Sequence, residues 1–422
     1  MHYGIITYGS RGDVQPYLAL SIGLMERGHS VTLFANENFS SFAENFGIPF
    51  YPLPGNIEEM VHSPEVLHVL QSGNIIGFFR ELQKMSRIVQ PRVNAVMLAG
   101  CAKPDVLVAS PLATIWIYSI AEKLNKNWAM VQLSLPTVPT KQFPFVGFSF
   151  FNTAWYNLFT YRLIRYIYWR LNKKDINEHR KSLELPILKE SILKEITEKK
   201  ILNLYAFSAS LIERPKDWPA EVDITGFLTI PEEKRKQLLA EEPPVGMTQW
   251  LQNGEAPIYV GFGSIPIPDT KKFAAIIGEI LEKTNHRIIF CQGWSELPSI
   301  PPHERLFVVK LINHTWLFPQ CKTAIIHGGI GTIAAVLSAR IPVIIVSIFG
   351  DQPLWGKLIA TKRLGIHMPF KKLTTKKLLV AISKSQTFKI KQQAFIAGES
   401  MRREDGLRRA IDALEVYFKA KK

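Results

Sequence analysis

A glycine-rich segment near residue 327 combines the residue types that bind phosphate. The apolar run Thr323–Ile326 leads into His327, and Gly328, Gly329 and Gly331 come next, before a further apolar stretch. Glycines let a backbone approach a ligand closely, and the N–H groups at the start of a helix attract anions. We therefore expect a strand, a phosphate-binding turn and a helix, with His327 adding a hydrogen bond or a positive charge. A purely structural turn around a buried histidine is the alternative.

A second polar pair follows the predicted strand at residues 342–348. Asp351 and Gln352 stand in the segment Gly350-Asp-Gln-Pro, and a carboxylate beside an amide can bind neighbouring hydroxyl groups. The pair predicts a polyhydroxylated ligand, with a helix cap before Pro353 as the alternative. Gly329, Gly331 and Ala334 also satisfy the spacing of a dinucleotide fingerprint. The position of that motif in the second half of the chain, and the Asp-Gln-Pro turn, argue against a nicotinamide cofactor.

The first predicted strand is followed by a similar turn, Gly9-Ser-Arg-Gly-Asp-Val-Gln-Pro16. Asp13 falls near the start of the next predicted helix. Its carboxylate could accept a proton as a general base, while helix capping is an equally strong interpretation.

The elements that must position these residues alternate along the chain. Short apolar strands and helices follow one another from residue 2 and again from residue 257, which is typical of parallel sheets covered on both faces. We predict an α/β protein with two doubly wound, Rossmann-like domains facing a cleft. The expected division is an N-terminal domain (1–229), a charged, Pro-rich linker (230–247), a C-terminal domain (248–400) and a C-terminal helix (401–422) that packs back on the first domain.

The composition excludes several classes of protein. Of the 422 residues, 47% are hydrophobic and 21% charged, so a disordered or fibrous chain is excluded. Three cysteines are too few for a disulfide framework or a cysteine zinc site. The net charge of +15 indicates an anionic partner. We expect no nucleic acid, because the basic residues lack interleaved base-stacking motifs.

Two sequence features bear on location. The chain opens on the predicted strand 2–8 without a basic leader, and the uncharged stretch 142–161 is interrupted by Pro144 and Gly147. We therefore expect a cytoplasmic protein without a membrane span, and keep peripheral association with the inner face of the membrane as an open alternative.

Aromatic and basic residues are concentrated between residues 143 and 181. Twelve aromatic residues lie within 143–169, and Arg162, Arg165 and Arg170 are interspersed among the later ones. Such a stretch could contact an anionic membrane, line a pocket for an apolar ligand, or form ordinary core. On the pocket interpretation, the acceptor-side residues would include Phe143, Phe148 and Trp155.

Four motifs in a fixed order resemble the UDP-glycosyltransferase superfamily. They are the segments 9–16, 261–264, 327–332 and 350–356, and the likeness extends over almost the whole chain. The sequence is most similar to the sterol glucosyltransferase branch and to bacterial antibiotic and lipid glycosyltransferases. The resemblance implies the two-domain GT-B fold and an inverting transferase. Its expected reaction moves a hexose, UDP-glucose being the preferred donor, to a hydroxyl of a lipophilic acceptor such as a sterol or polyketide.

The resemblance also implies roles for individual residues. Asp13 becomes the base that activates the acceptor, with Ser10 and Arg11 beside it on the acceptor side. The donor-binding residues are Ser264, His327, Gly328, Gly329, Gly331, Thr332, Asp351 and Gln352.

Three positions depart from the family pattern. Ile326 replaces a histidine of close bacterial relatives, and Ala335 and Val309 replace the ribose-binding glutamate and base-stacking tryptophan of plant relatives. Trp294 is the proposed substitute for base stacking. Because the sequence contains no Asp-x-Asp triplet, we expect no metal and no cofactor besides the nucleotide sugar. A nucleotide-sugar epimerase and a transferase that uses a dTDP-deoxysugar are the alternative functions.

Overall fold

A computed structural model describes residues 1–72, 75–235, 243–295 and 301–421. The chain divides into two compact units: unit 1 comprises residues 1–56, 86–234 and 404–422, and unit 2 comprises residues 57–85 and 235–403. Residues 57–85 fall within the predicted N-terminal domain in sequence but cluster with unit 2. Residues 236–242 of the predicted linker lie outside the described residues.

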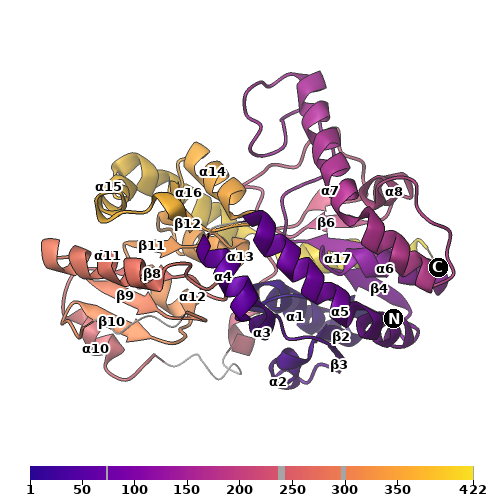
Figure 1. Cartoon of the computed structure of the whole chain (residues 1–422), viewed down its shortest axis with the longest axis horizontal. Coiled ribbons are helices and arrows are strands. Elements are labelled where there is room, and N and C mark those ends of the chain that lie inside the picture. Colours follow the sequence, from indigo (N-terminus) through magenta and orange to yellow (C-terminus); the bar gives the residue numbers. More distant parts are fainter. Residues whose placement is uncertain (73–74, 236–242, 296–300, 422) are drawn as a thin grey trace. The chain divides into compact units, whose positions relative to one another are not determined.

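Unit 1 is built on a seven-stranded parallel sheet with the order β3-β2-β1-β4-β5-β6-β7 (Figure 1). Its strands are β1 (His2–Ile6), β2 (Ser30–Asn36), β3 (Phe50–Leu53), β4 (Val106–Ala109), β5 (Trp128–Gln132), β6 (Asn203–Tyr205) and β7 (Val222–Ile224). The central strands β1 and β4 are apolar and almost completely buried. Both faces of a parallel sheet must be covered, which explains why these strands do not alternate between apolar and polar residues.

Helices cover the sheet of unit 1. They are α1 (Arg11–Glu26), α2 (Ser40–Glu44), α6 (Thr114–Lys123), α7 (Ala154–Ser182), α8 (Ile192–Glu198) and α17 (Gly406–Lys419), with the short helix η1 (Glu37–Phe39). The short helix α9 (Glu232–Arg235) spans the point where the chain passes from unit 1 to unit 2. Helix α5 (Ile75–Cys101) begins in unit 2 and ends in unit 1. At the end of the chain, α17 packs against α1, where Arg27 pairs with Asp412 at 2.8 Å.

Unit 2 contains a six-stranded parallel sheet with the order β10-β9-β8-β11-β12-β13. The strands are β8 (Ile258–Gly261), β9 (Ile288–Cys291), β10 (Leu306–Val309), β11 (Thr323–Ile326), β12 (Val343–Ser347) and β13 (Gly365–Pro369). The helices are α3 (Ile57–Val61), α4 (Pro64–Ser72), α10 (Met247–Gln252), α11 (Thr270–Lys283), α12 (His314–Leu317), α13 (Ile330–Ser338), α14 (Gln352–Thr361), α15 (Thr375–Ser385) and α16 (Phe388–Arg403), with η2 (Phe318–Gln320) and η3 (Phe370–Lys372).

The strand order reverses direction at the centre of each sheet. The reversal lies between β1 and β4 in unit 1 and between β8 and β11 in unit 2. In doubly wound folds, ligands bind at the carboxyl ends of the strands beside this reversal. The turn at residues 9–13 follows β1 and the turn at residues 327–331 follows β11, so both predicted motifs occupy these places. The prediction of two Rossmann-like domains is confirmed.

Within the described part of the chain, no helix combines the length and the apolar character needed to cross a bilayer.

Candidate functional site

The predicted phosphate turn after β11 has the shape that a phosphate-binding loop requires. His327 directly follows the strand, Gly328 adopts a φ of +103°, and Gly329 is the residue before α13. A Cβ added at Gly329 would lie 2.5 Å from Nε2 of His327, so that edge of the imidazole faces the start of the helix. Gly331 is exposed in the first turn of α13, where a Cβ would meet nothing within 4 Å. Thr332, half-buried, is the next residue of the helix.

Burial determines the charge of His327. The side chain is only 9% exposed, and desolvation lowers its pKa from 6.5 to about 4. Its Nδ1 atom is buried without a hydrogen-bond partner among the described residues. Of the two contributions predicted from the sequence, the structure therefore favours a hydrogen bond from neutral imidazole over a positive charge at neutral pH.

The turns after β8 and β9 lie against this histidine. A Cβ at Gly263 would be 3.6 Å from Cε1 of His327, and Ser264 follows in the same turn. The backbone N–H of Trp294, in the turn after β9, donates to the carbonyl of Gly263 at 2.9 Å. The structure thus brings Ser264, Trp294 and the phosphate turn together at one edge of the sheet.

The turn after β12 completes this group. A Cβ at Gly328 would be 3.4 Å from Cβ of Gln352, so the two turns are in contact. Asp351 accepts a hydrogen bond from Nε1 of Trp355 at 2.8 Å, which fixes the orientation of its carboxylate. Although Asp351 is at the surface, partial desolvation by the surrounding protein raises the pKa of its carboxyl.

Part of the Gln352 side chain forms hydrogen bonds within its own turn. Its side-chain oxygen accepts hydrogen bonds from the backbone N–H groups of Ile348 (2.8 Å) and Phe349 (3.2 Å), and the residue is buried. Only the NH₂ group of the amide is therefore suited to contact a ligand. The prediction from the sequence had assigned the whole amide to the binding of hydroxyl groups.

Sequence reasoning did not identify the part that residues 57–72 play in unit 2. Nε2 of His62 lies 2.9 Å from the backbone oxygen of Trp294, and its Nδ1 lies 2.7 Å from the backbone oxygen of Glu58. Val66, fully buried, packs against Ile348 and Phe349 of the turn after β12. This segment therefore braces two of the turns described above. No local motif marks it, because both contacts join residues more than 200 positions apart.

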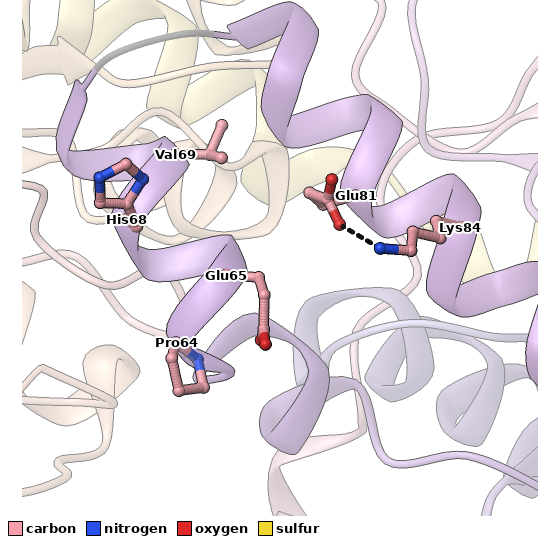
Figure 2. A pocket seen from close by; sticks show the side chains of 6 residues that line it. All are labelled: Pro64, Glu65, His68, Val69, Glu81 and Lys84. Carbon is pink, nitrogen blue, oxygen red and sulfur yellow. Dashed lines mark ion pairs between the residues drawn. The ribbon is translucent and has the colours of Figure 1, made fainter.

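Helices α4 and α5 line a shallow, open pocket of about 440 Å³ (Figure 2). Its lining comprises Pro64, Glu65, His68, Val69, Glu81 and Lys84, and Glu81 pairs with Lys84 at 3.7 Å. Figure 2 shows Glu65, Val69 and Glu81 pointing into the space between the two helices. None of these residues was predicted as a site residue.

In unit 1, the structure places Asp13 in the first turn of α1. Ser10, half-buried, is the N-cap residue, and its backbone N–H and Oγ–H donate to Oδ2 of Asp13 at 2.8 and 2.9 Å. Asp13 is therefore not the cap itself but the third helical residue. Arg11 is exposed, and its guanidinium lies 5.3 Å from the ring centre of Phe42.

Asn36 holds this turn from the neighbouring strand. Its Oδ1 accepts from the N–H of Gly9 at 3.0 Å, and its Nδ2 donates to the carbonyl of Gly55 at 2.8 Å. Gly9 has a φ of +139°, which favours glycine. The sequence analysis missed Asn36, although a polar residue at the end of an apolar strand is the signal that could have indicated it.

The predicted aromatic acceptor residues fall into separate groups. Phe148 contacts Phe145, whereas Trp155 contacts Tyr156 and is 70% exposed. Phe143 is half-buried in the loop before α7. The structure therefore does not join Phe148 and Trp155 in one aromatic cluster.

Replacing Gly331 by alanine should separate binding from folding. Alanine at this helical position meets no atom and should stabilise the protein by up to about 1 kcal/mol, yet its methyl group would lie where the predicted phosphate would approach the helix. We expect a higher melting temperature together with weaker binding of UDP in calorimetry. Gly278→Ala in α11, where a Cβ also meets nothing within 4 Å, should raise stability and leave binding unchanged. If the Gly331→Ala protein binds UDP as tightly as the natural protein does, the phosphate does not bind at this turn.

Two buried histidines should make the protein sensitive to acid. Burial lowers the pKa of His179, in α7, and of His327 from 6.5 to about 4. Between pH 6.5 and pH 4 the unfolded chain binds protons at these histidines that the folded protein does not. The free energy of unfolding should therefore fall as the pH decreases from about 6.5 to 4. In urea titrations, His327→Gln should reduce this slope by about 1.4 kcal/mol per pH unit. Parallel pH profiles of the variant and the natural protein would contradict the assignment.

Two family models match separate parts of the chain. The glycosyltransferase family 28 N-terminal domain matches residues 3–167, and the erythromycin biosynthesis protein CIII-like C-terminal domain matches residues 276–408. The first range contains the turn at Asp13 and the second contains the turns at His327 and Asp351.

Full-length comparisons extend the similarity over nearly the whole chain. Two sterol 3-beta-glucosyltransferases of Arabidopsis thaliana are each 31% identical; the matches cover 99% and 98% of this chain, and 65% and 68% of the relatives. A sterol 3-beta-glucosyltransferase of Candida albicans is 30% identical over 97% of this chain, which corresponds to 27% of that protein. The chain thus spans about two thirds of the plant relatives and about a quarter of the fungal one.

Solved structures share the fold. The calicheamicin glycosyltransferase CalG4 superposes with a TM-score of 0.69 at 13% identity, covering 99% of this chain and 98% of that protein. The glycosyltransferase VinC, solved with dTDP, gives a TM-score of 0.65 at 12% identity, covering 99% of this chain and 100% of that protein. With the plant relatives and both family models in agreement, the chain belongs to the UDP-glycosyltransferase superfamily and has its GT-B fold.

Proposed function

We propose that this protein is an inverting glycosyltransferase that moves a hexose from a nucleotide-diphosphate sugar to a hydroxyl group of a lipophilic acceptor. UDP-glucose is the proposed donor and a sterol-like compound the proposed acceptor. The observation that carries the proposal is the assembly of four turns around His327 at the centre of the sheet of unit 2. The names of the plant and fungal relatives support the class of acceptor.

Each of the four turns would bind a different part of the donor. The start of α13, with Gly331 and Thr332, would hold the phosphates through backbone N–H groups, and His327 would donate a hydrogen bond to them. Ser264 would add a further phosphate contact. Asp351 and the NH₂ group of Gln352 would bind the sugar hydroxyls, and Trp294 would stack on the base.

The chemical step is a direct displacement at the anomeric carbon. Asp13 would accept the proton of the acceptor hydroxyl while the acceptor oxygen forms a bond to that carbon. The bond from the anomeric carbon to the diphosphate breaks, its electron pair leaves with the nucleotide diphosphate, and the configuration inverts. Two hydrogen bonds from Ser10 fix the position of the Asp13 carboxylate in the first turn of α1. The proposed step uses no metal ion and no cofactor.

Two alternatives lead to different products. A dTDP-deoxysugar donor is the second candidate, because VinC and the spinosyn rhamnosyltransferase SpnG were solved with thymidine diphosphate. A nucleotide-sugar epimerase would convert the nucleotide sugar into its epimer and would need no acceptor. We also propose that the protein meets its acceptor at an anionic membrane surface as a peripheral protein.

A donor and acceptor panel tests the proposal. The protein is incubated with UDP-glucose, UDP-galactose or dTDP-glucose, each with and without detergent-dispersed sterol, and the products are analysed by mass spectrometry. We expect release of UDP only with sterol present, and a sterol product that carries one hexose. An epimeric UDP-sugar formed without acceptor would favour the epimerase, and transfer from dTDP-glucose but not from UDP-glucose would change the proposed donor.

A further inference from the structure

One face of α7 carries large apolar side chains that the rest of unit 1 leaves in solvent. Trp155, Phe159, Arg162, Tyr166 and Arg170 follow at intervals of four, three, four and four residues and are all exposed. This spacing places them along one side of a helix. We refer to these five residues as the α7 stripe.

The surroundings of the α7 stripe are also apolar. Phe150 and Phe151, in the loop before the helix, are 80% and 65% exposed, and Phe151 contacts Tyr156, which in turn contacts Trp155 of the stripe. Figure 1 shows the first turns of α7 and this loop extending beyond the strands of their own unit. Contiguous exposed apolar surface of this kind marks an interaction site rather than ordinary surface.

The opposite face of α7 already has its partners. Asn157, Thr160 and Tyr161 are buried, and the helix packs against α6 and α8. The α7 stripe is therefore not the core-facing side of the helix, which settles the ordinary-core alternative for these five residues.

The segment of the chain that contains the α7 stripe carries charge of one sign. Between residues 142 and 174 the chain contains no aspartate or glutamate, and Lys173 and Lys174 continue the positive charge of Arg162 and Arg170. All four basic residues are exposed. A second copy of this chain docking through the same face would place these like charges together, which is unfavourable. A surface of negative charge with an apolar interior is complementary to both properties of the face.

Arg165 does not belong to this surface, although the sequence grouped it with Arg162 and Arg170. Its guanidinium donates to the backbone oxygen of Thr137 at 3.2 Å and to Oγ1 of Thr197 at 2.9 Å, and burial lowers its pKa. It connects α7 to neighbouring segments and is a poor choice for testing a surface contact.

We infer that the α7 stripe binds the surface of an anionic lipid bilayer, with the aromatic rings in the interface and the basic residues against the headgroups. Its role in giving the enzyme access to a membrane-dissolved acceptor rests on the proposed function, whereas the binding itself does not. The surface would let the protein reach a lipophilic substrate without a spanning helix.

Sedimentation with vesicles tests the charged contacts. Vesicles of phosphatidylcholine with phosphatidylserine should bind the natural protein more strongly than vesicles of phosphatidylcholine alone, and added salt should weaken the binding. Arg162→Gln with Arg170→Gln should weaken binding about 5-fold per arginine, roughly 25-fold for the pair. Lys271→Gln with Lys376→Gln removes the same charge from exposed positions on α11 and α15 of unit 2, and should have a much smaller effect.

A second pair of variants tests the apolar contacts. Phe159→Ser with Tyr166→Ser should reduce binding to the same vesicles and lower the rate of transfer to a sterol embedded in them. Because both side chains are at least half exposed, the melting temperature should not change. Transfer to a water-soluble acceptor should also be unchanged.

Three results would overturn the inference. They are a natural protein that does not bind anionic vesicles, α7 variants that bind them as well as the natural protein does, and a natural protein that self-associates through this face without binding vesicles. Vesicle binding is measured without donor or acceptor. Intact binding by a protein that transfers no sugar would therefore reject only the proposed function.

Discussion

Asp13→Asn should slow sugar transfer by about 10²- to 10⁴-fold while the fold and the affinity for UDP remain unchanged. The amide oxygen of asparagine can still accept the hydrogen bonds that Ser10 donates to Oδ2 of Asp13, so the first turn of α1 is kept. What the substitution removes is the ability to take a proton from the acceptor. Steady-state transfer rates, thermal unfolding and calorimetry with UDP measure the three expected results.

A matched control comes from another aspartate at the start of a helix. Asp405 caps α17 in the same unit, where its side chain accepts from the N–H of Arg408 at 3.1 Å. Asp405→Asn should leave the rate of transfer unchanged. A folded Asp13→Asn protein that turns over at the natural rate would limit Asp13 to stabilising its helix.

His327→Ala should weaken UDP binding about 10- to 100-fold and reduce transfer about 10²- to 10³-fold. The buried neutral imidazole is placed to donate a hydrogen bond beside the start of α13, and alanine removes the donor without replacing it. Calorimetry with UDP measures the first effect and saturating kinetics the second. Unchanged UDP affinity would show that the histidine only fills the turn.

Asp351→Asn provides the contrast to this variant. Its amide oxygen can still accept from Nε1 of Trp355, so α14 should remain in place. Because the proposed role of Asp351 is to bind the sugar, the variant should bind UDP-glucose more weakly and free UDP as well as the natural protein does. The reverse pattern in the two variants would exchange the assignments of His327 and Asp351.

The sequence was sufficient to predict the sheets and the central turns for a simple physical reason. A parallel strand covered on both faces must be apolar throughout, so Val106–Ala109 and Thr323–Ile326 could be recognised at their observed bounds. The turns that follow β1 and β11 are marked by glycines, two of which adopt a positive φ. These signals are local and therefore readable in one sequence.

The features that escaped prediction depend on contacts between distant residues. The strands β6 and β7 have three residues each, too few to show a pattern, and they exist because neighbouring strands complete their hydrogen bonds. The contact of His62 with Trp294 joins segments far apart in the chain. The burial of Arg165 and the use of the Gln352 oxygen within its own turn likewise follow from packing.

The measurement that tests the central claim most directly is the structure of the product formed from UDP-α-glucose and a sterol. Purified product is examined by NMR for the linkage and the configuration of the anomeric carbon. Direct displacement predicts a β-glucoside joined through the sterol hydroxyl. An α-glucoside would contradict the inverting step, and UDP release without any glycoside would contradict glycosyl transfer itself.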